Sequence, residues 1–395
     1  MHLASRLDHI EPFYVMECAK TAQAIAASAE CDPARGGEEM IFLNVGEPDF
    51  TAPPLVREAA QRAITAGRTQ YTPSTGLHTL RECIARWYRQ RQGLEIDPGR
   101  IVVTAGASAA LQLACLALFE RGDEVLLADP SYPCNRHFVA AADALPRLLP
   151  AGAGQRFQLD AATVEAAWTP ATRGVLLASP SNPTGTSIDP REMARIASTV
   201  RERGGVCIVD EIYQGLSYDE RYGRSALALA DGLGEQVVSV NSFSKYFSMT
   251  GWRLGWLVLP TALVAPVERL AQNLFICAST VAQHAALACF EPESIAEYER
   301  RREAFRARRD RVVPALGALG LPVPVMPDGA FYAWVDCSAH GESWELAHRL
   351  MRLAHVALTP GRDFGRHDPE RWLRLSFASS MAQLDQALTR LQRLG

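Results

Sequence analysis

Lysine is scarce in this chain of 395 residues. Lys20 and Lys245 are its only lysines, and the other 38 of its 40 basic residues are arginines. An arginine guanidinium stays protonated in proteins and is a poor nucleophile, whereas a lysine amine can lose its proton and react. Chemistry that needs a primary amine side chain, such as imine formation, therefore has only two candidate residues.

The sequence also lacks a strong charge of either sign. Its 40 basic residues face 44 acidic ones, a net charge of −4, which argues against a nucleic-acid-binding surface. The longest weakly polar run, residues 105–119, is too short to span a membrane. Charged residues interrupt the first 40 positions and leave no signal-peptide core, and we therefore expect a cytoplasmic protein.

Metal-site patterns are missing as well. No two of the nine cysteines are closer in sequence than Cys277 and Cys289, and none belongs to a Cys/His cluster with zinc-site spacing. An odd number of cysteines does not fit a disulfide framework. We expect reduced, mostly buried thiols and no metal site.

Short apolar runs alternate with amphipathic stretches through the middle of the chain. This alternation predicts an α/β fold with a mostly parallel sheet flanked by helices. The expected strands are residues 100–104, 124–128, 174–178, 205–209, 236–240 and 254–259, and the helices between them include 108–119 and 190–203.

The pattern changes after Pro260. A long charged helix is expected over residues 297–316, followed by strands at 330–335 and 373–377 and helices at 343–354 and 381–394. This order indicates a second, smaller α+β domain. We expect a large domain over residues 51–289 and a small domain built from residues 1–50 and 290–395.

Polar residues follow four of the expected strands at their carboxyl ends. They occupy positions 105–108, 179–185, 210–213 and 241–245. In parallel sheets, ligands bind at the carboxyl ends of the strands. Four strand ends that carry Asn, Asp, Tyr, Ser and Lys side chains, together with a helix N-terminus, predict one shared pocket.

Lys245 stands among groups suited to an anion with several oxygens. Ser242 and Ser244 precede it and Arg253 follows it, and serine hydroxyls with an arginine fork can hold a phosphate. The helix that opens at the first of the four strand ends adds main-chain N–H groups and a favourable dipole. The alternative is an exposed lysine in a polar loop, but the apolar residues around Lys245 argue against full exposure.

Asp210 ends an apolar run, and a buried carboxylate needs a partner. One fitting partner is a heteroaromatic nitrogen that must stay protonated to act as an electron sink. Tyr213, three residues later, can hydrogen-bond a phenolate oxygen. The alternative is an aspartate that caps the following helix, which is common after strands.

Three further residues have both a structural and a functional interpretation. Asn182 is either a turn-forming residue or a ligand-binding amide. Tyr132 is either a core residue or a ring that stacks on a flat cofactor. Arg374 lies in an apolar strand and needs an anion, which is either a structural carboxylate or that of a substrate.

Taken in order, these motifs resemble the class I/II, fold-type I aminotransferases, which depend on pyridoxal 5′-phosphate (PLP). The resemblance covers nearly the whole chain, and its most specific part is the Ser-x-Ser-Lys segment with the Gly-Trp-Arg block. The matching segments are residues 44–50, 71–73 with Gly76, 104–106, 182–185, 210–213, 242–245, 251–255, 329–332 and 374–376.

The resemblance implies a role for each residue around the cofactor ring. Lys245 would form the imine with PLP, and its freed amine would later move a proton on the substrate. Asp210 would pair with the ring nitrogen, Tyr213 and Asn182 would bind the ring 3-oxygen, and Tyr132 would stack on the ring.

The resemblance also implies how the charged ends of cofactor and substrate are held. The phosphate would be bound by Ala107, Ser108, Ser242, Ser244 and Arg253. The substrate α-carboxylate would be bound by Arg374, Asn182 and the Gly46 main chain. Tyr71 would reach the phosphate of the partner subunit, which implies a homodimer with shared active sites.

The implied reaction moves an amino group from an L-amino acid to a 2-oxo acid by a ping-pong mechanism. Aspartate-using relatives often have a lysine where Ser108 stands, and no lysine is available here to replace it. We therefore expect a neutral donor, alanine or a larger apolar or aromatic amino acid, although an arginine could still bind aspartate. Phe13, Tyr14, Phe275 and Tyr332 are candidates for an apolar pocket.

Two other functions remain open. A PLP-dependent carbon–sulfur β-lyase or a related enzyme on the same fold would share the cofactor motifs. A non-catalytic PLP-binding regulator would carry an N-terminal DNA-binding module. Only about 40 residues precede the Gly46 motif, too few for such a module and its linker, and the net negative charge also disfavours it.

Overall fold

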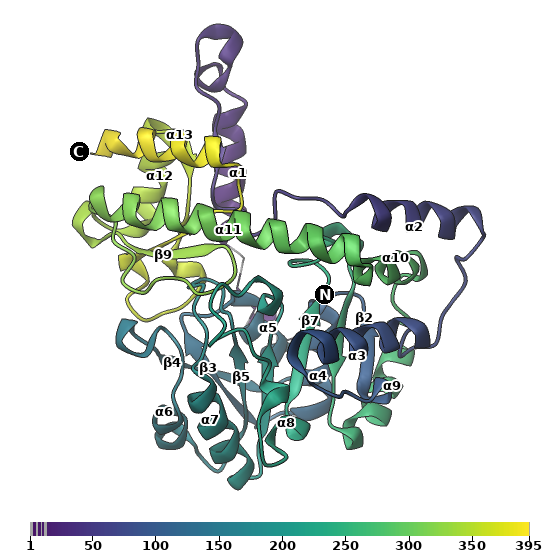
Figure 1. The fold of residues 1–395 in the computed structure, drawn as a ribbon. Helices are drawn as coiled ribbons and strands as arrows, with labels where there is room; N and C mark the ends of the chain where they lie inside the picture. The colour runs from purple at the N-terminus through teal and green to yellow at the C-terminus, as the bar shows by residue number, and fades with distance from the viewer. Residues whose placement is uncertain (1–2, 5–6, 9, 12–13, 395) are drawn as a thin grey trace.

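A seven-stranded sheet forms the centre of the molecule (Figure 1), in the order β2-β8-β7-β6-β5-β3-β4. The computed structural model describes residues 3–4, 7–8, 10–11 and 14–394. The strands of this sheet are β2 (Ile101–Thr104), β3 (Glu124–Asp129), β4 (Leu145–Pro150), β5 (Thr172–Ala178), β6 (Val206–Asp210), β7 (Val238–Ser242) and β8 (Gly255–Val258). All of them except β8 run in the same direction, so the predicted α/β fold with a mostly parallel sheet is confirmed.

The six strands expected from the sequence each lie within two residues of their predicted ends. Strand β8 runs antiparallel to both of its neighbours, β2 and β7. Strand β4 was not expected, because Pro146 and Arg147 interrupt its apolar pattern. Its place at the edge of the sheet explains how a proline is tolerated there.

Helices cover both faces of this sheet because successive strand side chains point to opposite sides. On one face Val125 and Leu127 join the core made by α4 (Ala107–Leu118), α5 (Pro133–Ala141) and α9 (Thr261–Leu274). On the other, Leu126 packs with α6 (Ala161–Ala167) and α7 (Pro190–Glu202). α3 (His78–Gln92) covers the part of that face formed by β2 and β8.

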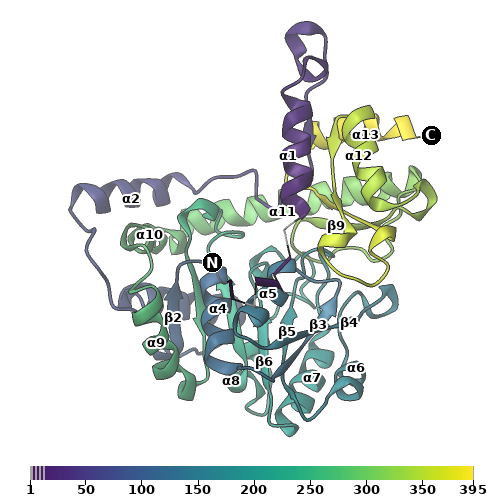
Figure 2. The ribbon, with the colours of Figure 1, turned by 180° about the vertical axis from the view of Figure 1, so that it is seen from behind.

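A smaller lobe lies beyond one end of the sheet (Figure 2). Its strands are β1 (Ile41–Phe42), β9 (Tyr332–Asp336), β10 (Val356–Ala357), β11 (Thr359–Pro360) and β12 (Trp372–Ser376), and its helices are α1 (Tyr14–Ala26), α12 (Ser343–Leu353) and α13 (Met381–Leu391). β11, β12 and β9 form an antiparallel sheet, and β1 pairs in parallel with β10. The N-terminal and C-terminal segments therefore lie together, whereas domain boundaries at residues 50 and 290 stay a prediction.

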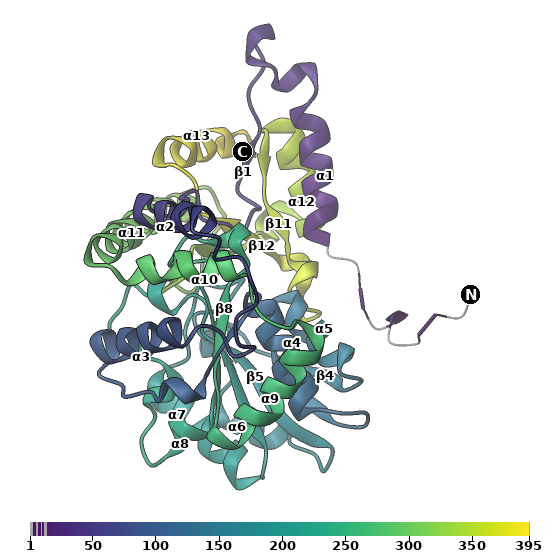
Figure 3. The same cartoon turned by 90° about the vertical axis from the view of Figure 1, so that its right-hand side faces the viewer.

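One long helix and one projecting arm complete the fold. α11 (Pro292–Ala318) runs from α10 (Thr280–Ala286) to the smaller lobe, and α8 (Leu233–Gln236) precedes β7. α2 (Pro54–Thr65) lies away from the large sheet and packs on α10 (Figure 3). Within the described ranges, no helix combines the length and apolar character needed to cross a membrane. All nine cysteines are free, and six of them are buried.

Candidate active site

The carboxyl ends of β2, β5, β6 and β7 meet at a cavity of about 260 Å³ between the large sheet and the smaller lobe. The cavity is lined by Val15, Gly46, Ala107, Ser108, Leu111, Tyr132, Ala178, Pro180, Asn182, Asp210, Ile212, Tyr213, Ser242, Ser244, Lys245, Thr250, Arg253, Tyr332 and Arg374. Every residue named from the sequence for binding the cofactor or the substrate α-carboxylate is in this set except Tyr71. The structure thus brings the candidates together, while their roles remain predictions.

Lys245 lies in the loop after β7, half-buried, with its amine in the cavity. Its Nζ donates a hydrogen bond of 2.6 Å to the Gly46 carbonyl oxygen. Burial lowers the pKa of this amine to about 8, and the nearby Arg374 and Arg253 charges act in the same direction. The other lysine, Lys20, is exposed on α1 and does not line the cavity.

Asp210 is the last residue of β6 and is only 4% exposed. Burial raises the pKa of its carboxyl to about 7, and the Glu211 carboxylate beside it adds to the shift. Its Oδ1 accepts a hydrogen bond of 3.2 Å from the Ile212 main-chain N–H. Asp210 does not cap the following 3₁₀ helix, Gln214–Leu216, whose N-cap is Tyr213. Its carboxyl faces the cavity, where a cationic nitrogen would stabilise it.

The start of α4 forms a cradle for an anion. Gly106 precedes the helix with a φ of +85°, and a Cβ added there would lie 2.6 Å from Arg253 Nη2. The Ser244 main-chain N–H donates to Ser242 Oγ (3.0 Å), which holds the two serines together at the cavity wall. A helix N-terminus, an arginine and two hydroxyls provide the donors that a phosphate group accepts.

Arg374 points from β12 into the cavity and is 3% exposed. Its Nη1 donates to Asn182 Oδ1 (3.0 Å) and its Nη2 to the Asn44 carbonyl oxygen (2.6 Å). Tyr332 and Phe364 flank the guanidinium at 4.6 and 4.9 Å. Among the described residues no carboxylate forms an ion pair with Arg374, and its buried Nε has no partner. These observations argue against a structural salt bridge at Arg374. An anionic ligand could instead accept a hydrogen bond from the Nε–H group, which is buried without a partner.

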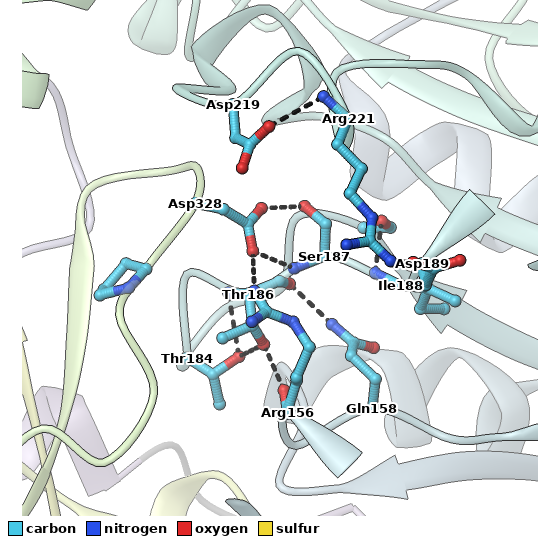
Figure 4. Close-up of polar contacts among 12 residues, drawn as sticks. Arg156, Gln158, Thr184, Thr186, Ser187, Ile188, Asp189, Asp219, Arg221 and Asp328 are labelled. Carbon is cyan, nitrogen blue, oxygen red and sulfur yellow. Dashed lines mark hydrogen bonds and ion pairs between the residues drawn. The ribbon is translucent and has the colours of Figure 1, made fainter. Parts of the chain in front are cut away.

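The turn that carries Asn182 is held from behind by a buried polar network (Figure 4). Asp328, in the loop before β9, accepts hydrogen bonds from Ser187 Oγ and Arg156 Nη2, both at 2.5 Å. Its own main-chain N–H donates to the Gly185 carbonyl oxygen (2.9 Å). These bonds fasten the smaller lobe to the Asn182 turn, so that Asn182 and Arg374 meet although they come from different sheets.

The apolar side of the cavity differs from the expectation. Of the four residues proposed for an apolar pocket, Tyr332 lines the cavity, Tyr14 and Phe275 do not, and Phe13 lies outside the described residues. Val15, at the start of α1, lines the cavity instead. Its main-chain N–H donates a hydrogen bond of 2.5 Å to Asp363 Oδ2. Leu111 and Thr250, at other parts of the wall, were not singled out from the sequence either.

Tyr71 stands apart from the cavity of its own chain. It lies in the extended segment between α2 and α3, and 79% of its surface is exposed. With so little of its surface covered, the Tyr71 ring packs only slightly on its own chain. An exposed Tyr71 is free to contact a partner subunit, as the resemblance implies, and that contact stays a prediction.

An amine at a strand end, a buried carboxylate and an anion cradle at a helix N-terminus are the features expected of an enzyme that holds a phosphate-bearing cofactor. A family model, aminotransferase class I and II, matches residues 38–391. The chain belongs to this family, and the resemblance inferred from its motifs is confirmed. Members of the family generally use PLP and act on amino acids and 2-oxo acids.

Known relatives match over nearly their whole length. A valine–pyruvate aminotransferase of Mycobacterium tuberculosis is 37% identical over 97% of this chain and 96% of its own. A probable aspartate/prephenate aminotransferase of Aquifex aeolicus is 34% identical over 99% of this chain and 98% of its own. Among solved structures, an aminotransferase from Mycobacterium tuberculosis gives a TM-score of 0.92 at 36% identity, covering 100% of this chain and 98% of that one. The aspartate aminotransferase of Thermus thermophilus with maleate gives 0.89 at 32% identity, with both chains fully covered.

Proposed function

We propose that this aminotransferase uses PLP to move an amino group from an L-amino acid to a 2-oxo acid, with Lys245 as the residue that binds the cofactor covalently. The observation that carries the proposal is the placement of the Lys245 amine and the Asp210 carboxyl in one cavity, next to an anion cradle. Burial brings the pKa of both groups near neutrality, where groups that bind or transfer protons are most effective.

The residues of the cavity fit PLP. Asp210 offers the buried carboxylate that a protonated ring nitrogen needs, and Tyr213 and Asn182 offer donors for the ring 3-oxygen. Tyr132 provides a flat face. The phosphate donors are Ala107, Ser108, Ser242, Ser244 and Arg253. When bound, PLP supplies an electron sink that stabilises negative charge at the substrate Cα.

The protein's own residues then bind and orient the substrate and move its protons. Arg374 holds the α-carboxylate with its guanidinium fork, helped by Asn182 and the Gly46 main chain. The neutral Lys245 amine would take the proton from Cα of the amino acid in the first half-reaction, and it would deliver a proton to Cα of the newly formed amino acid in the second. Because the 2-oxo acid product leaves before the second 2-oxo acid enters the same site, the kinetics are ping-pong.

We further propose a donor with a neutral side chain. The described lining of the cavity holds three basic side chains, Lys245, Arg253 and Arg374, and each already has a role in this scheme. None is left for the distal carboxylate of aspartate, and Ser108 stands where aspartate-using relatives often have a lysine. The name of one relative contains valine and pyruvate, while others are named for aspartate or aromatic amino acids. Comparison of kcat/KM for alanine, valine, phenylalanine and aspartate tests this, and a preference for aspartate would overturn it.

Shared active sites in a homodimer complete the proposal. The exposed position of Tyr71 on the α2–α3 segment supports it, because 79% of this residue's surface is available for contact with a partner subunit. We also keep the sequence-based prediction of a cytoplasmic location.

The scarcity of lysine makes a sharp test of the covalent role. Lys245→Arg keeps the charge but removes the reactive amine, and it should abolish the cofactor absorbance band that borohydride reduces. The matched control is Lys20→Arg, which leaves Lys245 as the single lysine and should keep both the band and the activity. A reduced cofactor adduct found in the Lys245→Arg protein would contradict the assignment.

A half-reaction separates the transaminase from the β-lyase alternative. Purified enzyme is mixed with an amino acid and no 2-oxo acid, and ammonia and 2-oxo acid are measured over time. A transaminase stops after about one equivalent of 2-oxo acid per site, because the amino group stays on the enzyme. Continued release of ammonia would favour the lyase.

A further inference from the structure

Tyr332, the first residue of β9, touches three of the groups assigned to the active site. Its hydroxyl lies 2.9 Å from the hydroxyl of Tyr213, and both side chains are buried. Its ring lies under the guanidinium of Arg374, 4.6 Å from ring centre to Cζ. A Cβ added to Gly46 would lie 2.6 Å from the Tyr332 hydroxyl. This hydroxyl therefore also packs against Gly46, whose carbonyl oxygen accepts a hydrogen bond from the Lys245 amine.

These contacts fix the Tyr332 ring in one position. Its plane stands nearly perpendicular to that of Tyr213, at 82° with ring centres 5.7 Å apart, and Phe331 packs against both rings. Burial raises the pKa of both tyrosines above the ordinary value. Both phenols therefore keep their protons at neutral pH, and the pair has two O–H donors to direct.

The direction of the bond between the hydroxyls follows from what Tyr213 has to do. A phenol has one O–H donor, and its oxygen can accept further bonds. If Tyr213 donates its proton to the 3-oxygen of a bound cofactor, it has none left for Tyr332. The contact between the hydroxyls is then a hydrogen bond only if Tyr332 donates.

We propose that the Tyr332 hydroxyl donates a hydrogen bond to the Tyr213 oxygen and thereby positions Tyr213 to donate to the 3-oxygen of the cofactor. The inference rests on the proposed function. Tyr332 is a positioning residue, since it acts through Tyr213. Chains of hydrogen bonds strengthen one another, so the second bond makes Tyr213 a better donor. The smaller lobe, through β9, then takes part in setting the electronic state of a cofactor held by the large sheet.

The test uses the pH titration of the cofactor absorbance in the holoenzyme. Loss of a donor to the 3-oxygen destabilises its anionic form, so the titration midpoint should move to higher pH. Tyr213→Phe should shift the midpoint most, and Tyr332→Phe should shift it in the same direction by about half a pH unit. The double variant should match Tyr213→Phe alone, because Tyr332 has nothing to act through once Tyr213 has lost its hydroxyl.

Tyr218→Phe is the matched control. The Tyr218 hydroxyl also makes a hydrogen bond within the protein, to the Ala330 carbonyl oxygen near the start of β9, but it does not line the cavity. Its removal should leave the midpoint unchanged. Thermal unfolding of all variants shows whether they fold alike. We expect that they do, because each Tyr→Phe substitution keeps the aromatic ring and removes only the hydroxyl.

The outcomes separate this inference from the proposed function. An unchanged midpoint in Tyr332→Phe would overturn the inference, and so would shifts that add up in the double variant. If the wild-type protein showed no cofactor band that depends on Lys245, the proposed function itself would fail. A band that depends on Lys245, together with a non-additive shift, would support both.

Discussion

At the scale of single residues, burial acts in opposite directions on the two titratable groups that matter most. The pKa of the Lys245 amine falls to about 8, and that of the Asp210 carboxyl rises to about 7. Both shifts favour the neutral form, because burial away from water penalises charge of either sign. A ligand that brings its own charges therefore finds an amine ready to react and a carboxyl ready to ionise.

The shifted amine leads to a prediction on how the apoenzyme takes up its cofactor. Covalent attachment needs the neutral amine, so the rate should rise with pH and level off above a midpoint near 8, well below the 10.5 of an ordinary lysine. Stopped-flow absorbance with apoenzyme and excess PLP measures it. A rate that kept rising up to pH 10 would contradict the assigned environment of Lys245.

At the scale of elements, the start of α4 depends on a glycine for two separate reasons. Gly106 adopts a φ of +85°, which strains any residue with a Cβ. It also leaves room for the Arg253 guanidinium, which lies 2.6 Å from where a Cβ would be. Gly122, in the turn before β3, has a similar φ of +97° but nothing within 4 Å of its added Cβ.

The two glycines separate backbone strain from crowding at the cradle. Gly106→Ala and Gly122→Ala should each lose about 1 kcal/mol of unfolding free energy, from the positive φ. Only Gly106→Ala should also weaken PLP binding, by about tenfold or more, because Arg253 has to move. Denaturant unfolding and a spectroscopic titration of apoenzyme give the two numbers. Equal PLP affinity in both variants would contradict the proposed role of Arg253 in binding the phosphate.

At the scale of the whole molecule, the active site as proposed is larger than one chain. The cavity lies between the large sheet and the smaller lobe, whereas the exposed Tyr71 lies in the segment after α2 and does not line it. A symmetric dimer that placed this segment over the partner's cavity would bury Tyr71 and complete both sites at once.

Mixing two inactive variants tests the shared site. Lys245→Ala and Tyr71→Ala chains, each inactive or nearly so, should regain activity when unfolded together and refolded, because a mixed dimer contains one intact site. Equal amounts should give about a quarter of the wild-type activity, since half of the dimers are mixed and each has one working site of two. No recovery above the sum of the separate variants would show that Tyr71 acts in its own chain or not at all.

The sequence was sufficient to predict that polar residues at the ends of several strands share one cavity. Asp210 ends β6, whereas Asn182 and Lys245 lie in the loops after β5 and β7, and parallel strands bring their carboxyl ends to one edge. The positions were therefore predictable from local patterns together with one rule of topology. The same patterns could not predict β4, because a proline and an arginine at an edge strand erase the apolar signal.

Other contacts depend on pairings that no local pattern encodes. Tyr332 meets Tyr213 from 119 positions away, and only the packing of β9 against the large sheet brings them together. Val15 reaches the cavity because Asp363, far along the chain, fixes the start of α1. A valine at a helix start carries no signal of its own, and Tyr14 beside it was the more conspicuous but wrong choice.

The pairing of β1 with β10 constrains how the chain can be made. Ile41 aligns with Val356 across 315 positions, so the first strand of the smaller lobe has no partner until residue 356 has left the ribosome. The large sheet, complete by residue 258, can fold in the meantime from contacts nearer in sequence. Gly46 follows β1 by only four residues, so we expect the loop whose carbonyl oxygen accepts the Lys245 amine to take its place after the large sheet has formed. The active site would then be complete only once β10 has been synthesised.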